Sequence, residues 1–83
     1  MKLEENWAID TDRIRCFFAE QPDVVQTVDG FLFGRCQITL IPTPGQLLGK
    51  WQQNRTIVIM EGPDADTTQI HQRFFLRFLS AGG

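Results

Sequence analysis

The chain has 83 residues, a net charge of −2 and a pI of about 5.1. This length is that of one small domain, so residues 1–83 are treated as a single unit. The acidic balance argues against nucleic-acid binding, since general nucleic-acid binders carry an excess of lysine and arginine. Two cysteines are too few for a disulfide framework. No apolar run approaches the length of a membrane span, so we expect no membrane contact and a cytoplasmic location with free thiols.

Residues 1–9 are expected to be a short lead-in. They lack the apolar region of a signal peptide and carry two adjacent acids, Glu4 and Glu5. Trp7 either packs at the edge of the core or is exposed as an anchor for a partner, and we favour the first.

The first helix is predicted from Asp10 to about Glu20. Asp10 is a suitable N-cap, and Ile9 and Ile14 then have the spacing of a hydrophobic staple. The helix should end before Pro22, because the residue before a proline disfavours the α conformation. Its buried stripe is predicted to be Ile14, Phe17 and Phe18.

Residues 24–41 should form two or three strands. Asp29-Gly30 is a signal for a type I′ hairpin turn, whereas Gly34 is either a β-bulge or part of the turn itself. From Arg35 onward the apolar residues alternate with polar ones, which predicts a half-buried strand with Cys36, Ile38 and Leu40 inward. Cys16 faces away from the helical stripe, so a bond between the two cysteines is not expected.

Residues 42–54 have no clear period. We favour one helical turn in which Leu47, Leu48 and Trp51 fold onto the core. The alternative is a binding loop in which Trp51 offers a flat face between Lys50 and Arg55, because long irregular connections in small domains are often functional.

The most regular part of the sequence is a strand, a turn and a helix over residues 55–79. Residues 56–60, TIVIM, are apolar on both faces, which predicts a central strand that ends at Gly62-Pro63. Asp66 is the best N-cap for a helix from Thr67 to Leu79, with Gln69 completing a capping box. The wide apolar arc of this helix suggests contact with the sheet and first helix, or else with a partner chain: Ile70, His71, Phe74, Phe75, Phe78 and Leu79.

The chemistry of the sequence is sparse. A lone His71 within an apolar arc is typical of a core or edge residue, and no catalytic residue, metal site or cofactor is predicted. Arg73 and Arg77 lie one helical turn apart and form, with Arg35 or Arg55, either a solvated basic strip or a binding surface.

The chain ends in Gly82-Gly83, a tail that an adenylating enzyme could accept. In length and ending it is similar to the small sulfur-carrier proteins of thiamine and molybdopterin synthesis and to ubiquitin-like modifiers. The resemblance implies a carrier modified at Gly83. Those proteins open with a β-hairpin and run a strand into the tail, whereas a helix is predicted here just before residues 80–83, which should be flexible.

A second resemblance lies in the order of elements. A helix, the strands at VDGFLFG and CQITLI, a lone Trp51, the stretch RTIVIMEGPDAD and a closing helix look like the C-terminal domain of cobalamin-synthesis-type metallochaperone GTPases. These residues contain neither a GTPase domain nor its metal-binding cysteines, so the resemblance concerns architecture alone.

The sequence therefore predicts an α+β fold of two layers. An antiparallel sheet of three or four strands would pack on two helices, in the order α-β-β-(β)-β-α, with Val58, Met60 or Ile41 on an open face. We expect a non-enzymatic interaction or accessory module that forms a homodimer or docks on another protein. The predicted binding residues are Lys50, Trp51, Arg55, Arg73 and Arg77, and the alternative is the carrier with its tail at Gly82 and Gly83.

Overall fold

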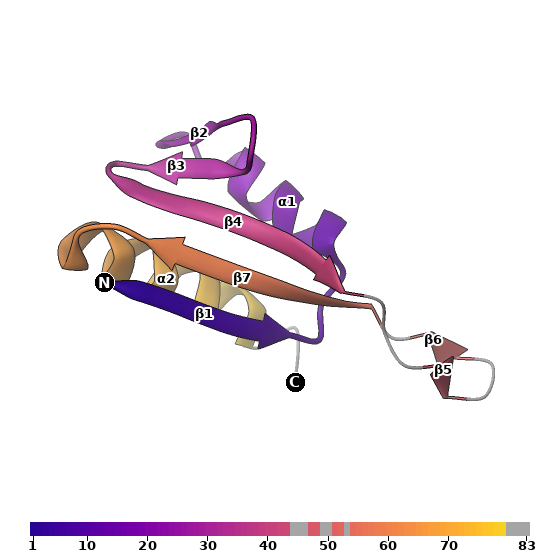
Figure 1. Cartoon of the computed structure of the whole chain (residues 1–83). Coiled ribbons are helices and arrows are strands. Elements are labelled where there is room, and N and C mark those ends of the chain that lie inside the picture. The colour runs from indigo at the N-terminus through magenta and orange to yellow at the C-terminus, as the bar shows by residue number, and fades with distance from the viewer. Residues whose placement is uncertain (44–46, 49–50, 53, 80–83) are drawn as a thin grey trace.

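The computed structural model describes residues 1–43, 47–48, 51–52 and 54–79, with side chains described over 1–43 and 54–79. The fold is α+β, with an antiparallel sheet and two helices, as predicted (Figure 1). The elements in chain order are β1 (Lys2–Trp7), α1 (Thr11–Glu20), β2 (Val24–Gln26), β3 (Phe31–Phe33), β4 (Cys36–Thr43), β5 (Leu47–Leu48), β6 (Trp51–Gln52), β7 (Arg55–Glu61) and α2 (Asp64–Leu79).

The main sheet has five strands in the order β1-β7-β4-β3-β2, rather than the three or four predicted. The additional strand is β1, which lies within the expected lead-in and pairs along its whole length with β7. Leu3 and Trp7 lie on the same face of β1 and pack against the core. Glu5 lies between them on that face, and this charged residue breaks the apolar alternation by which a strand is recognised.

Both helices cover the same face of the sheet, which makes two layers (Figure 1). The covered face of β7 is formed by Thr56, Val58 and Met60, each at most 2% exposed. Ile57 and Ile59 alternate with them and therefore lie on the uncovered face. The expectation that Val58 or Met60 would be on the open face is wrong, because these two side chains face the helices. Ile41 does lie on the open face, as predicted, and is 41% exposed.

The two turns that join β2, β3 and β4 differ from each other. The β2–β3 turn is centred on Val28 and Asp29, since the amide of Thr27 donates to the carbonyl of Gly30 at 2.8 Å. Asp29 has no positive φ, so the type I′ prediction for Asp29-Gly30 is wrong. Gly34 does belong to a turn: Phe33 pairs with Cys36, and Gly34 has a φ of +58°. This is the glycine position of a type II′ turn.

Helix α1 has the predicted position and buried stripe. Asp10 is at the N-cap, but its side chain makes no capping hydrogen bond, and Gln21 is the C-cap. The buried stripe contains Ile14, Phe17 and Phe18. Cys16 is exposed and Cys36 buried, and both thiols are free.

Helix α2 begins at Asp64, three residues before the predicted start. Asp66 is therefore inside the first turn rather than at the N-cap. Its carboxylate accepts a hydrogen bond from the backbone N–H of Arg35 at 3.0 Å, which fastens the β3–β4 turn to the helix.

Residues 47–48 and 51–52 do not form the predicted helical turn. Leu47–Leu48 and Trp51–Gln52 pair as a small antiparallel hairpin, β5–β6, which lies beyond the ends of β4 and β7 and away from both helices (Figure 1). The side chain of Trp51, Lys50 and residues 80–83 all lie outside the described residues.

Candidate functional site

The structure does not bring the predicted arginines together. Arg55 lies on β7, and its Nε donates to Asn6 Oδ1 at 3.0 Å on the uncovered side of the sheet. Arg73 and Arg77 lie on α2, in the other layer. Arg73 and Arg77 therefore do not form the predicted basic strip with Arg55. Lys50, Gly82, Gly83 and the side chain of Trp51 lie outside the described residues.

Arg73 is held in a structural contact. Its two terminal nitrogens donate to the two carboxylate oxygens of Asp23, both at 2.8 Å, and its guanidinium lies 5.1 Å from the ring centroid of Phe33. The hydrogen bond from Arg73 lowers the pKa of Asp23, and Asp23 in turn raises the pKa of Arg73. These contacts fasten α2 to the segment before β2.

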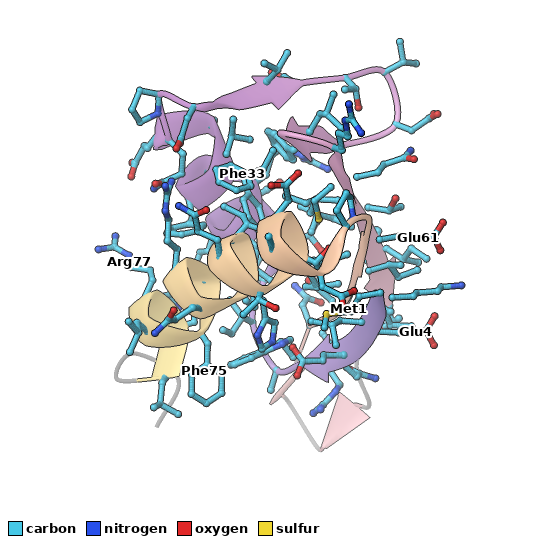
Figure 2. All side chains as sticks on the ribbon, turned by 90° about the vertical axis from the view of Figure 1, so that its left-hand side faces the viewer. Met1, Glu4, Phe33, Glu61, Phe75 and Arg77 are labelled. Carbon is cyan, nitrogen blue, oxygen red and sulfur yellow. The ribbon has the colours of Figure 1, made fainter. Side chains whose placement is uncertain are left out.

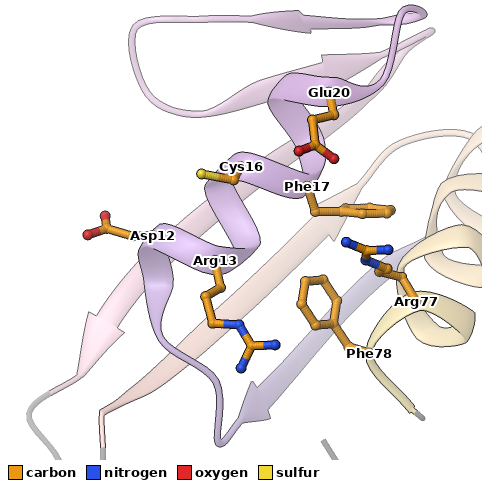
Figure 3. Close-up of a pocket in the computed structure, with 7 residues that line it drawn as sticks. All are labelled: Asp12, Arg13, Cys16, Phe17, Glu20, Arg77 and Phe78. Atoms are coloured by element: carbon orange, nitrogen blue, oxygen red, sulfur yellow. The ribbon is translucent and has the colours of Figure 1, made fainter. Parts of the chain in front are cut away.

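Arg77 lines a groove between the two helices, with a volume of about 470 Å³ (Figure 3). The charges around the groove balance, and its floor is aromatic: Asp12, Arg13, Cys16, Phe17, Glu20, Arg77 and Phe78. Figure 3 shows the Cys16 side chain on the other side of α1 from Phe17. The groove thus offers neither a concentrated charge nor a thiol aimed at its floor.

His71 is part of a small polar cluster between β1 and α2. Its Nε2 lies 2.7 Å from Glu5 Oε1, and the indole N–H of Trp7 donates to the same oxygen at 3.3 Å. The Trp7 ring meets Phe74 edge-on, with the ring centroids 5.0 Å apart. These contacts explain how Glu5 is tolerated on the covered face, and they fit the prediction that His71 is a core or edge residue.

Over residues 1–43 and 54–79, no group of three or more histidine, cysteine or acidic side chains is arranged to hold a metal ion. In the described part of the chain, neither helix has the length and apolar character needed to cross a membrane.

The most distinctive surface is the uncovered face of the sheet, which we call the open face. Strand register places Ile57 beside Ile41, and Ile59 beside Thr39. Charged and polar side chains surround these isoleucines: Lys2, Glu4 and Asn6 from β1, Gln37 and Thr43 from β4, and Arg55 and Glu61 from β7. Figure 2 shows Glu4 and Glu61 projecting from the side of the sheet opposite the helices, whereas Phe75 and Arg77 lie on the helix side.

A second apolar surface lies on α2, where Phe75, Leu76 and Leu79 are 37%, 63% and 53% exposed. It adjoins residues 80–83, which are not described. Of the predicted apolar arc, Ile70, Phe74 and Phe78 are buried within the chain, whereas Phe75 and Leu79 are exposed.

Sequence reasoning found Arg55 and Ile41 but missed Ile57 and Ile59. The signal was present in TIVIM, because a strand that is apolar on both faces needs cover on both faces. What the sequence left undetermined was which face the helices would take.

The chain matches no protein-family model, and no curated protein or solved structure shows significant similarity to it.

Proposed function

We propose that this chain is a non-enzymatic protein-interaction module whose docking surface is the open face. The observation that carries the proposal is the row formed by Ile41 and Ile57 with Ile59 beside it, on a sheet face that neither helix covers. Apolar side chains enclosed by a polar rim are the usual composition of a protein-binding surface.

The charges of the open face favour a protein over a nucleic acid. Two acids, Glu4 and Glu61, offset two bases, Lys2 and Arg55. A phosphate backbone would be recognised by an excess of positive charge, and this rim has none. A partner that carries both signs of charge around apolar side chains fits it better.

The test is photo-crosslinking in cells of the source organism. A photoreactive amino acid at Thr39, which lies beside Ile59 on the open face, should give protein adducts identified by mass spectrometry. The comparison position is Leu76 on α2, the competing apolar surface. In a background of Ile59→Lys, the adducts at position 39 should disappear, since a charge is then placed within the apolar row.

Adducts at position 76 but not at position 39, or no adduct at either position, would show that the open face is not the docking surface.

A further inference from the structure

We infer that the open face is built to pack against the same face of a second copy of this chain, an inference that rests on the proposed function and specifies the partner. The open-face residues of β7 are, in order, Arg55, Ile57, Ile59 and Glu61. The run reads basic, apolar, apolar, acidic, so that it is complementary to itself when reversed.

Consider a twofold axis that lies in the plane between two packed open faces, perpendicular to β7 and level with Val58. This axis brings the β7 strands of the two copies together in antiparallel directions. Arg55 of one copy then lies opposite Glu61 of the second copy, and Ile57 lies opposite Ile59. The reverse contacts follow from symmetry, so each pair occurs twice, as in an isologous interface. The apolar pairs lie near the axis, and the ion pairs enclose them at both ends.

The other symmetric arrangement is disfavoured by charge. With a twofold axis along β7, Glu61 would lie opposite Glu61, and Arg55 opposite Arg55. Like charges placed opposite each other across an interface are costly, so the run selects the antiparallel arrangement.

The two charged side chains have atoms left to make these bonds. Arg55 uses Nε to bind Asn6, and its two terminal nitrogens have no partner among the described side chains. Glu61 contacts Lys2 at 4.0 Å through Oε2, with both side chains more than half exposed. The strands of two packed sheets cross at about 30°. A charged group about 10 Å from the twofold axis is thereby displaced by roughly 5 Å from its partner, a distance that an arginine side chain can span.

The interface should be small. The strands β1, β7 and β4 span about 10 Å across and about 20 Å along, which with their side chains gives a few hundred Å² per copy. Stable interfaces bury about 800 Å² per partner, so we expect a Kd in the micromolar range or weaker.

The experiment is sedimentation equilibrium of the purified full chain at low ionic strength over a range of concentrations. The wild-type chain should show a concentration-dependent dimer. Arg55→Glu alone and Glu61→Arg alone each place like charges opposite one another at both ends, and each should weaken the dimer by about tenfold or more. Arg77→Glu, on the helix side, is the matched control and should leave the Kd unchanged.

An equimolar mixture of the Arg55→Glu and Glu61→Arg chains is the decisive sample. One chain then carries two acids and the other two bases at the ends of the run, so that both ion pairs form again between unlike chains. The mixture should associate more tightly than either variant alone, and the double variant R55E/E61R should dimerise like the wild type.

A chain that stays monomeric, or a dimer that neither reversal weakens, would overturn this inference. If the crosslinks at position 39 nevertheless form with a different protein, the proposed function stands and only the identity of the partner was wrong.

Discussion

Arg73 shows most clearly that the tertiary structure makes contacts that the sequence does not predict. From the sequence it was one of three arginines that could bind a partner. In the structure its guanidinium is bound by both oxygens of Asp23 and lies against the ring of Phe33. Asp23 is 50 residues earlier in the chain, and no local pattern connects the two positions.

The Asp23–Arg73 pair predicts a pH-dependent contribution to stability. The pKa of Asp23 is lowered in the folded chain, chiefly by its hydrogen bond with Arg73. The stabilisation is therefore complete above the usual aspartate pKa of about 3.9 and is lost as the pH falls through the lower folded value. Asp23→Asn should lower the free energy of unfolding at pH 7. The difference in unfolding free energy between this variant and the wild type should become smaller as the pH falls below about 4.

Urea unfolding across this pH range measures the effect. Asp29→Asn, in the neighbouring β2–β3 turn, removes a carboxylate that has no ion pair among the described residues and is the matched control. A gap between wild type and Asp23→Asn that stays constant with pH would show that the pair does not form.

At the scale of elements, the β3–β4 turn couples the sheet to α2. Gly34 adopts a φ of +58°, and a Cβ placed there would lie 2.8 Å from Asp66 Oδ2. The same carboxylate accepts the Arg35 N–H. The turn thus depends on glycine both for its backbone conformation and for the space that Asp66 occupies.

Gly34→Ala should lower the free energy of unfolding by about 1–3 kcal/mol, the cost of holding a residue with a Cβ in a sparsely populated backbone conformation. Gly34→Asn introduces the same Cβ, but asparagine is more common than alanine at the positive-φ positions of such turns, so its loss should be smaller. Thermal or urea unfolding of the wild type, Gly34→Ala and Gly34→Asn separates the cost of the backbone conformation from the cost of the added Cβ. An alanine variant as stable as the wild type would be incompatible with a positive φ at this position.

At the scale of the whole molecule, the placement of both helices on one face of the sheet determines which apolar residues are core and which are surface. Ile38 is fully buried, whereas Ile41, three residues along the same strand, is 41% exposed. The two positions face opposite sides because successive side chains of a strand alternate.

The same substitution at both isoleucines tests this arrangement. Ile38→Thr loses buried apolar contact and buries a hydroxyl, which should cost about 2–4 kcal/mol of unfolding free energy. Ile41→Thr should cost about 0.5 kcal/mol or less, as is usual for surface positions. Urea unfolding at concentrations where the chain is monomeric gives both values. Equal losses at the two positions would mean that the open face is covered within one chain.

The sequence by itself determined what depends on neighbouring residues. It located α1 with its Asp10 cap, the alternation of β4, the apolar strand β7 and the helix that follows, because caps and periodicities act over one or two turns. It missed β1, where Glu5 interrupts the apolar alternation, and it placed the start of α2 too late, since Asp66 binds Arg35 rather than its own helix.

Only the tertiary structure decided which face of the sheet the helices cover. TIVIM is apolar on both sides, so either side could have met the helices. The pairing of β7 between β1 and β4 joins residues far apart in the chain, and it places Ile57 and Ile59 with Ile41 on the open side. No local pattern encodes that contact, because it arises only when strands from both ends of the chain come together in one sheet.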